Sequence, residues 1–132
     1  YIFFGEKDYQ QLHLLKKFLR KKFRINVISC STVRDKNNVA LSSRNILLSK
    51  NDMSKSSFIA NLILNFKNKV KKTIHVAKEL DNIIFKINNL KNVKIEYLEI
   101  RNKFNLSKNY NKKNFKIFLA YYNKKIRLID NF

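Results

Sequence analysis

The opening stretch YIFFGEKDYQQL, residues 1–12, holds residues suited to chemistry and the only glycine of the chain, Gly5. An apolar strand, a glycine, a charged turn and a helix start are the order in which α/β folds present backbone N–H groups to a phosphate or sugar. Glycine lets a ligand come close because it has no side chain. The same spacing is also explained by a simple turn, with a solvated Lys7 and with Asp8 serving only as a helix cap.

A second arrangement is ALSSRN, residues 40–45, in which two hydroxyl residues, Ser42 and Ser43, precede Arg44. Hydroxyl and backbone donors beside a fixed cation would suit an anionic group. Taken alone, a loop with an exposed arginine is the simpler interpretation.

Other reactive side chains do not form a pattern. Glu96 and Glu99 are three apart on an expected strand, so they face opposite sides and do not pair for acid/base work. His13 and His75 lack partners at the spacing of metal ligands or a catalytic triad. Cys30 is the only cysteine and lies in the apolar run INVISC, which predicts a buried structural thiol.

The first elements position the opening stretch. Residues 1–4 are continuously apolar and predict a strand buried on both faces, as in a parallel sheet. Residues 8–23 predict an amphipathic helix, and Asp8 and Gln11 have the spacing of a capping box. Residues 25–29 predict a second strand. The order strand, helix, strand is one right-handed crossover of an α/β domain.

The later pattern predicts a different unit. A polar loop occupies residues 31–49, and two amphipathic helices follow at residues 51–72 and 74–90. Three strands are expected at residues 93–101, 115–122 and 125–129, with a bulge near Tyr97 where the alternation changes phase.

Composition limits the class of protein. A chain of 132 residues with 45% hydrophobic residues is one domain, or a small domain with a piece of another. No apolar run approaches the ~20 residues of a membrane span, and the start lacks the order of a signal peptide. The cytoplasm is the expected location, without a membrane partner.

The net charge of +20 would ordinarily indicate nucleic acid. The excess is mostly lysine spread along the chain, and it comes with no proline, no tryptophan and one glycine. That profile is typical of a coding sequence that has drifted towards A and T. No recognition helix, zinc-finger spacing or stacking strand is visible, so nucleic acid is not the expected partner. A basic nucleic-acid-binding module nevertheless stays as an alternative.

Three segments, FFGEKDYQQL, ALSSRNILLS and IRLIDN, together and in this order resemble the pantothenate synthetase (pantoate–β-alanine ligase) family. The segments TVRD and VKIEYLEIR are also similar, so the resemblance covers nearly the whole chain. It implies an α/β fold in which residues 1–32 end a Rossmann-like adenylyltransferase domain whose earlier part is missing. Residues 33–132 would form a small C-terminal domain of helices and a three-stranded antiparallel sheet.

The resemblance implies a ligase of pantothenate (vitamin B5) and coenzyme A biosynthesis. Such an enzyme uses ATP and Mg²⁺ to form pantoyl adenylate and pyrophosphate, after which the amine of β-alanine displaces AMP. Family members are usually homodimers, and the dimer contact is expected in the missing part.

The resemblance also implies roles for single residues. In the opening stretch, Gly5 and Asp8 would hold the ATP ribose, Lys7 would contact the phosphates and Gln11 would bind pantoate. In the loop, Val33 would line the adenine pocket. Ser42 and Ser43 would donate to phosphate oxygens, and Arg44 would neutralise charge there. Electrostatic catalysis would rest on Lys7, Ser42, Ser43 and Arg44.

The chain departs from the family pattern in two ways. The paired-histidine motif, a second pantoate-binding glutamine and the acidic Mg²⁺ residue belong to the earlier part of the family and are not in this sequence. The chain is therefore expected to be inactive by itself, and an inactive remnant of the ligase is a further alternative. Ser31 and Asn38 stand where the family commonly has proline and glycine, which predicts a less rigid loop or a strained turn.

Overall fold

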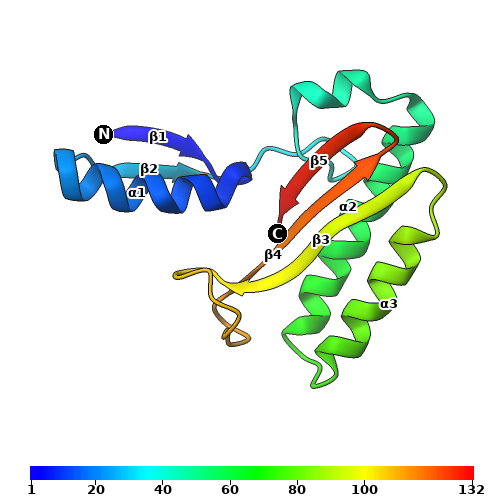
Figure 1. Ribbon diagram of the computed structural model, residues 1–132. Coiled ribbons are helices and arrows are strands. Elements are labelled where there is room, and N and C mark those ends of the chain that lie inside the picture. The colour runs from blue at the N-terminus through cyan, green and yellow to red at the C-terminus, as the bar shows by residue number, and fades with distance from the viewer.

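The computed structural model describes all of residues 1–132 and contains two sheets that lie side by side (Figure 1). The first is a parallel pair and the second an antiparallel sheet in the order β3-β4-β5, as expected. The strands are β1 (Ile2–Gly5), β2 (Val27–Cys30), β3 (Val93–Asn102), β4 (Phe115–Asn123) and β5 (Ile126–Asn131).

The N-terminal unit consists of β1, a 3-10 turn η1 (Glu6–Asp8), the helix α1 (Tyr9–Phe23) and β2. Leu12 is the buried residue of α1. Phe18, an apolar residue of the same amphipathic helix, is exposed. Arg24 ends the helix in the left-handed conformation, at φ 55°, and its N–H donates to the Leu19 carbonyl.

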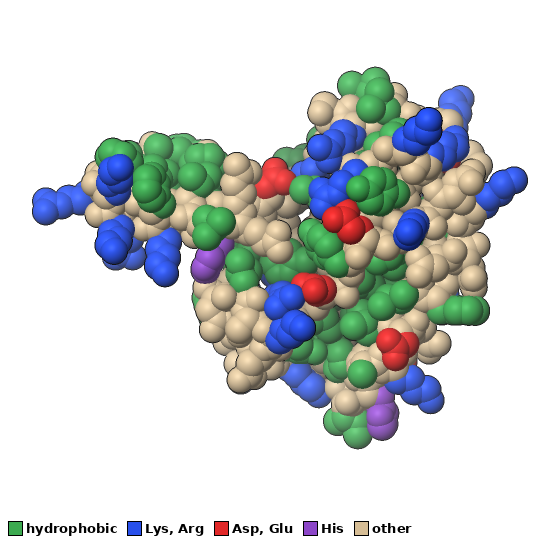
Figure 2. Space-filling model, in the orientation of Figure 1, with side chains coloured by type: hydrophobic (Ala, Val, Ile, Leu, Met, Phe, Trp, Pro, Cys, Tyr) green, Lys and Arg blue, Asp and Glu red, His purple; other side chains and the backbone are tan.

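One face of the β1–β2 pair is uncovered in this chain, so two predictions were wrong. Phe3 is 66% exposed and Ile28 40%, although residues 1–4 were expected to be buried on both faces. Cys30 is exposed rather than buried. Successive strand residues point to opposite faces, and a single helix covers only one face of a pair. Figure 2 shows hydrophobic side chains gathered on this part of the molecule.

The C-terminal unit packs two helices, α2 (Lys50–Val70) and α3 (Val76–Asn88), on the three-stranded sheet (Figure 1). Both helices were predicted by their apolar periodicity. The Ser49 hydroxyl accepts a hydrogen bond from the Asp52 N–H, which caps α2. Burying each large apolar side chain stabilises the fold by about 1.5–3 kcal/mol. The most deeply buried are Ile59, Ile63, Phe66, Val70, Ile87, Ile117 and Leu119.

The expected bulge in β3 is confirmed, because the pairing with β4 shifts between Ile95 and Tyr97. Glu96 lies in the bulge and accepts a hydrogen bond from Arg127 at 2.6 Å. Glu99 binds Arg101 instead, at 2.6 Å. The two carboxylates therefore have separate cationic partners and form no acid/base pair.

The loop of residues 31–49 contains a bridge between Arg34 and Ala40 and a 3-10 helix η2 (Ser43–Leu47). Asn38 adopts the left-handed conformation at φ 69°. Glycine adopts this backbone freely, and asparagine tolerates it better than most other residues. Of the two expectations for this loop, a less rigid loop or a strained turn, the positive φ at Asn38 is consistent with the turn.

Replacing Asn38 by alanine should lower the free energy of unfolding by about 1 kcal/mol, because alanine is strained at positive φ. Asn38→Gly relieves the strain but, like Asn38→Ala, loses the hydrogen bond that the Asn38 amide donates to Asn61 Oδ1 at 2.8 Å, so it should be more stable than Asn38→Ala. Urea unfolding of the intact protein measures both, with Asn37→Ala, at an exposed neighbour, as the control. Equal stability of the alanine and glycine variants at position 38 would contradict this assignment.

A charged cluster joins the start of α2 to the turn between β4 and β5. The Asp52 side chain is 4% exposed and binds Lys124, the Ser49 hydroxyl and Lys55. These bonds, that from Lys124 above all, hold the pKa of Asp52 far below its usual range. The carboxylate is therefore charged in the folded protein even in mild acid.

The free energy of unfolding should fall as the pH drops through about 4 and below. In that range the unfolded Asp52 takes up a proton that the folded one does not, so acid favours unfolding. Asp52→Asn should be less stable at neutral pH and should show a shallower slope between about pH 4 and 2. Denaturant titrations at several pH values, with the exposed Asp81→Asn as control, measure the difference. An unchanged slope in Asp52→Asn would refute the assignment.

Candidate functional site

The turn η1 faces the end of β5 across a pocket of about 120 Å³. Lys7, Asp8 and Gln11, to which the family resemblance gave roles in binding ATP and pantoate, all line this pocket. Across from them, the sheet contributes Tyr97, Asp130 and Asn131. The pocket therefore lies where the N-terminal and C-terminal units meet.

Within the chain, no hydrogen bond is made by the side chains of Lys7, Asp8 or Gln11, nor by those of Gln10 and Tyr97 in the same pocket. Asp8 is the N-cap residue of α1, but its carboxylate makes no capping hydrogen bond, so the predicted capping box is wrong. The backbone there, at φ −97° and ψ 59°, lies outside the extended conformation that normally aims a capping side chain at the helix. Together with Lys7 and Gln11, Asp8 is free to bind a ligand.

Gly5 lies at the end of β1 with ordinary extended dihedrals, φ −68° and ψ 140°. A Cβ atom at Gly5 would have no heavy-atom neighbour within 4 Å. Neither the backbone conformation nor packing in this chain requires glycine here. The open space allows another molecule, or another part of the protein, to approach the backbone closely.

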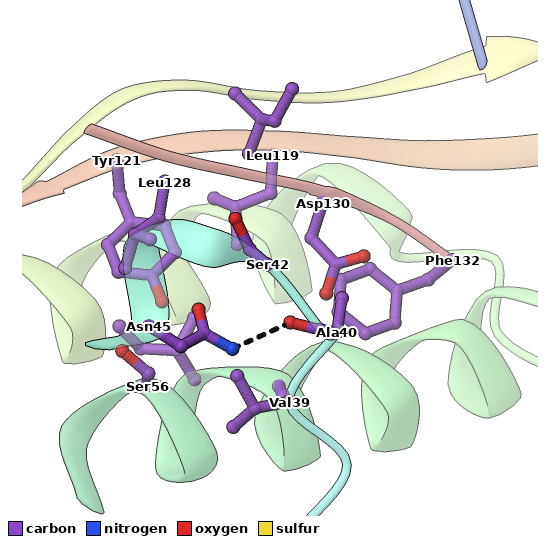
Figure 3. Close-up of a pocket in the computed structure, with 13 residues that line it drawn as sticks. Val39, Ala40, Ser42, Asn45, Ser56, Leu119, Tyr121, Leu128, Asp130 and Phe132 are labelled. Atoms are coloured by element: carbon purple, nitrogen blue, oxygen red, sulfur yellow. Dashed lines mark hydrogen bonds between the residues drawn. The ribbon is translucent and has the colours of Figure 1, made fainter. Parts of the chain in front are cut away.

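Hydrogen bonds hold the ALSSRN segment in one shape. The Ser42 hydroxyl accepts from the Arg44 N–H at 3.3 Å, which caps η2. The Asn45 amide donates to the Ala40 carbonyl at 3.0 Å (Figure 3). The Arg44 side chain donates to the Arg127 carbonyl on β5 at 3.0 Å. The loop thus presents exposed Ser43 and Arg44 from a braced backbone.

A small cavity of about 20 Å³ lies beneath this segment, with Ser42, Ser56 and Tyr121 among its lining residues (Figure 3). The Ser56 hydroxyl is buried there without a hydrogen-bond partner. Burial raises the pKa of Tyr121 to about 12, so its hydroxyl stays protonated. A space of this size holds about one water molecule, not a nucleotide.

The end of β5 separates the two hollows, since Ile129 and Asp130 line both. Ser42 lines the small cavity, whereas Lys7, Asp8 and Gln11 line the larger pocket. The remaining predicted residues line neither: Gly5, Val33, Ser43 and Arg44. The structure therefore brings Lys7, Asp8 and Gln11 together in one pocket and places Ser42 in the other, with Ile129 and Asp130 of β5 between the two.

Comparison with known proteins places the chain in one family. The family model described as pantoate-beta-alanine ligase matches residues 1–132. The chain belongs to the pantoate-beta-alanine ligase family. A pantothenate synthetase of Christiangramia forsetii is 33% identical over 133 residues, which cover 98% of this chain and 47% of that protein.

Solved structures of pantothenate synthetases have the same fold. The protein from Thermus thermophilus matches with a TM-score of 0.83 and 28% identity, over 98% of this chain and 48% of that one. The pantoate-beta-alanine ligase from Francisella tularensis, complexed with beta-gamma ATP and beta-alanine, matches with a TM-score of 0.66 and 29% identity, over 98% and 42%. The chain spans about half the length of the curated relatives it matches and corresponds to their C-terminal portion.

Sequence reasoning gave no role to several residues that hold the two units of this chain together. Arg34 donates to both oxygens of Asp130, at 2.7 and 2.9 Å. The Asn131 amide donates to the carbonyls of Glu6 and Lys7, both at 2.7 Å. Arg34 lies in TVRD, and Asp130 and Asn131 lie in IRLIDN, two segments that carry the family resemblance. That resemblance was the only available signal.

A lysine and a tyrosine complete the contact between the units. The Lys116 ammonium donates to the Asn131 side chain at 2.7 Å and lies 4.3 Å from the centre of the Tyr9 ring. Burial lowers the pKa of Lys116, while the neighbouring Glu6 carboxylate opposes that shift. The Tyr9 hydroxyl donates to the Lys103 carbonyl at 2.9 Å, and its ring lies 6.0 Å from that of Phe118.

Two other kinds of feature are absent from the chain. No cluster of three or more His, Cys, Asp or Glu side chains lies where it could hold a metal ion. None of the helices combines the length and apolar character that a membrane span requires.

Proposed function

We propose that the protein carrying this chain joins pantoate to β-alanine at the expense of ATP, giving pantothenate, AMP and pyrophosphate. In this proposal the chain supplies one half of the active site, for a step of pantothenate and coenzyme A biosynthesis. The observation that carries it is the pocket in which Lys7, Asp8 and Gln11 lie together without internal partners, close to Gly5 in the chain. The Francisella tularensis ligase, bound to beta-gamma ATP and beta-alanine, supports the choice of ligands.

The roles follow from the chemistry of each group. The backbone of Gly5 and the carboxylate of Asp8 are suited to ribose hydroxyls, because a free carboxylate accepts strong hydrogen bonds. The ammonium of Lys7 is suited to the phosphates, and the carboxamide of Gln11 to a pantoate hydroxyl or carboxylate.

The loop residues would act at the other side of the nucleotide. Ser42 and Ser43 offer hydroxyl and backbone donors to phosphate oxygens, and Arg44 offers positive charge. Val33, which is 66% exposed, would be shielded from solvent by the adenine ring. Because these residues stand apart from the Lys7 pocket in this chain, the proposal requires the nucleotide to extend past the end of β5 between the two groups.

The reaction needs no nucleophile from this chain. A carboxylate oxygen of pantoate attacks the α-phosphorus of ATP, the bond to pyrophosphate breaks, and a pantoyl adenylate forms. The amine of β-alanine then attacks the acyl carbon, AMP leaves, and the amine gives up its proton. Positioning and stabilisation of the phosphate charge supply most of the rate in such transfers.

Mg²⁺ would neutralise charge on the ATP phosphates. Hard oxygen ligands suit this ion, and this pocket offers Asp8 as its one unpaired carboxylate, because Asp130 is held by Arg34. We therefore place the protein ligands of the ion outside this chain. We also propose that residues 1–32 end the nucleotide-binding domain, that residues 33–132 form the small domain, and that a cytoplasmic homodimer forms through the rest of the protein.

Replacing Arg44 by alanine in the intact protein should lower kcat/KM for ATP about 10²- to 10³-fold, because a donor to the developing phosphate charge is lost. Steady-state kinetics and thermal melts measure the effect. Lys69→Ala, which removes an exposed ion pair with Glu79 between the two helices, is the control and should keep normal kinetics. Unchanged turnover in Arg44→Ala would mean that the motif no longer carries the chemistry, as in an inactive remnant.

Replacing Gly5 by valine should weaken ATP binding by about tenfold or more, the expected cost of losing one close backbone contact. Within this chain an added Cβ has no heavy-atom neighbour within 4 Å, so the packing described here does not oppose the substitution. Calorimetric titration with ATP and a thermal melt of the same sample separate the two effects. A stable variant with normal affinity would rule out a close approach of ATP to Gly5.

A further inference from the structure

Two consecutive residues at the end of β5, Asp130 and Asn131, contact both segments that are proposed to bind ATP. Asp130 holds Arg34, the residue after Val33. Asn131 holds the carbonyls of Glu6 and Lys7. Neighbouring strand residues point to opposite sides, so one side chain reaches each segment.

Asn131 uses both ends of its carboxamide. The residue is 4% exposed, and its Nδ2 donates to the two η1 carbonyls at 2.7 Å each. Its Oδ1 accepts from the Lys116 ammonium at 2.7 Å. The short η1 turn leaves carbonyl groups without helical partners, and the amide of Asn131 satisfies them.

Asp130 anchors the loop through Arg34, whose two terminal nitrogens donate four hydrogen bonds in all. Besides the two bonds to the carboxylate, Arg34 donates to the carbonyls of Asn38 and Asn131, both at 2.9 Å. Its guanidinium carbon lies 4.4 Å from the centre of the Phe132 ring. A planar guanidinium group with this many partners restricts the conformation of the loop beside Val33.

We propose that Asp130 and Asn131 are positioning residues for the nucleotide, which they do not touch. They set the distance between the turn at residues 6–8 and the loop at residues 33–45 through the stiff backbone of β5. Binding groups must be held to within about 0.5 Å, so a change at either side chain weakens ATP binding. This inference rests on the proposed function.

The discriminating variant is Asn131→Asp in the intact protein. Aspartate keeps the shape of asparagine and the acceptor that faces Lys116, but it puts an oxygen where Nδ2 donates to two carbonyls. We expect the Kd and KM for ATP to rise about tenfold, because the free energy of roughly one to two hydrogen bonds that hold the η1 turn is lost. The KM for β-alanine should change by less than about twofold, because substitutions at separate sites normally act independently to within about that factor.

Asp130→Asn tests the contact to the loop and should also raise the Kd for ATP. The substitution replaces the bidentate, charge-assisted pair between Arg34 and Asp130 by a weaker contact with a neutral amide. It also serves where Asn131→Asp does not fold. Glu79→Gln, on an ion pair between α2 and α3, is the matched control. Thermal melts show which variants are folded, and ATP binding is compared only among those.

The outcomes separate the inference from the function on which it rests. Folded variants at both positions with a wild-type Kd for ATP would overturn the positioning role and indicate a purely structural one. A wild-type intact protein that binds no ATP would refute the proposed function instead. Weaker ATP binding in the folded variants, with normal binding in Glu79→Gln, supports the positioning role.

Discussion

The polar contact between the end of β5 and the two segments beside it is the constraint on which the candidate site depends. A bidentate arginine pair has a defined geometry, and a buried amide with all its partners cannot move without losing them. Each polar group left unpaired there would cost about 1–3 kcal/mol. The position of the η1 turn relative to the small sheet therefore rests largely on directional bonds, with the Tyr9 ring on Phe118 adding apolar contact.

The same turn separates two kinds of polar group. Its carbonyls at Glu6 and Lys7 are bound by Asn131, whereas the side chains of Lys7 and Asp8 have no partner. Backbone groups fix the turn, and side chains are left for a ligand. Such preorganisation keeps the loss of freedom on binding small. The loop of Ser43 and Arg44 follows the same rule, because its capping bond and its bond to β5 use few of the available donors.

The sequence predicted those parts of the structure that depend on local periodicity. The helices α2 and α3, the three antiparallel strands and the bulge near Tyr97 all appear where the apolar pattern placed them. Exposure of Phe3 and Cys30 was not predictable in this way, because burial depends on which elements cover a strand. The free carboxylate of Asp8 depends on its backbone dihedral angles, which the spacing of a capping box does not specify. The contacts of Asp130 and Asn131 join residues 96 and 125 positions apart, and no short pattern encodes such pairings. Only the fold shows that their segment lies between the two groups of predicted site residues, whose roles in binding stay predictions.

Asn38 belongs to a wider property of this chain. Five residues have positive φ, and none of them is glycine. Three carry long side chains, Arg24, Leu106 and Lys124, for which this backbone costs about 1–2 kcal/mol each. A composition that has almost lost glycine thus retains the turns of the fold while giving up part of its stability margin. The protein is consequently more vulnerable to each further destabilising substitution than a relative with the same core and glycine in its turns.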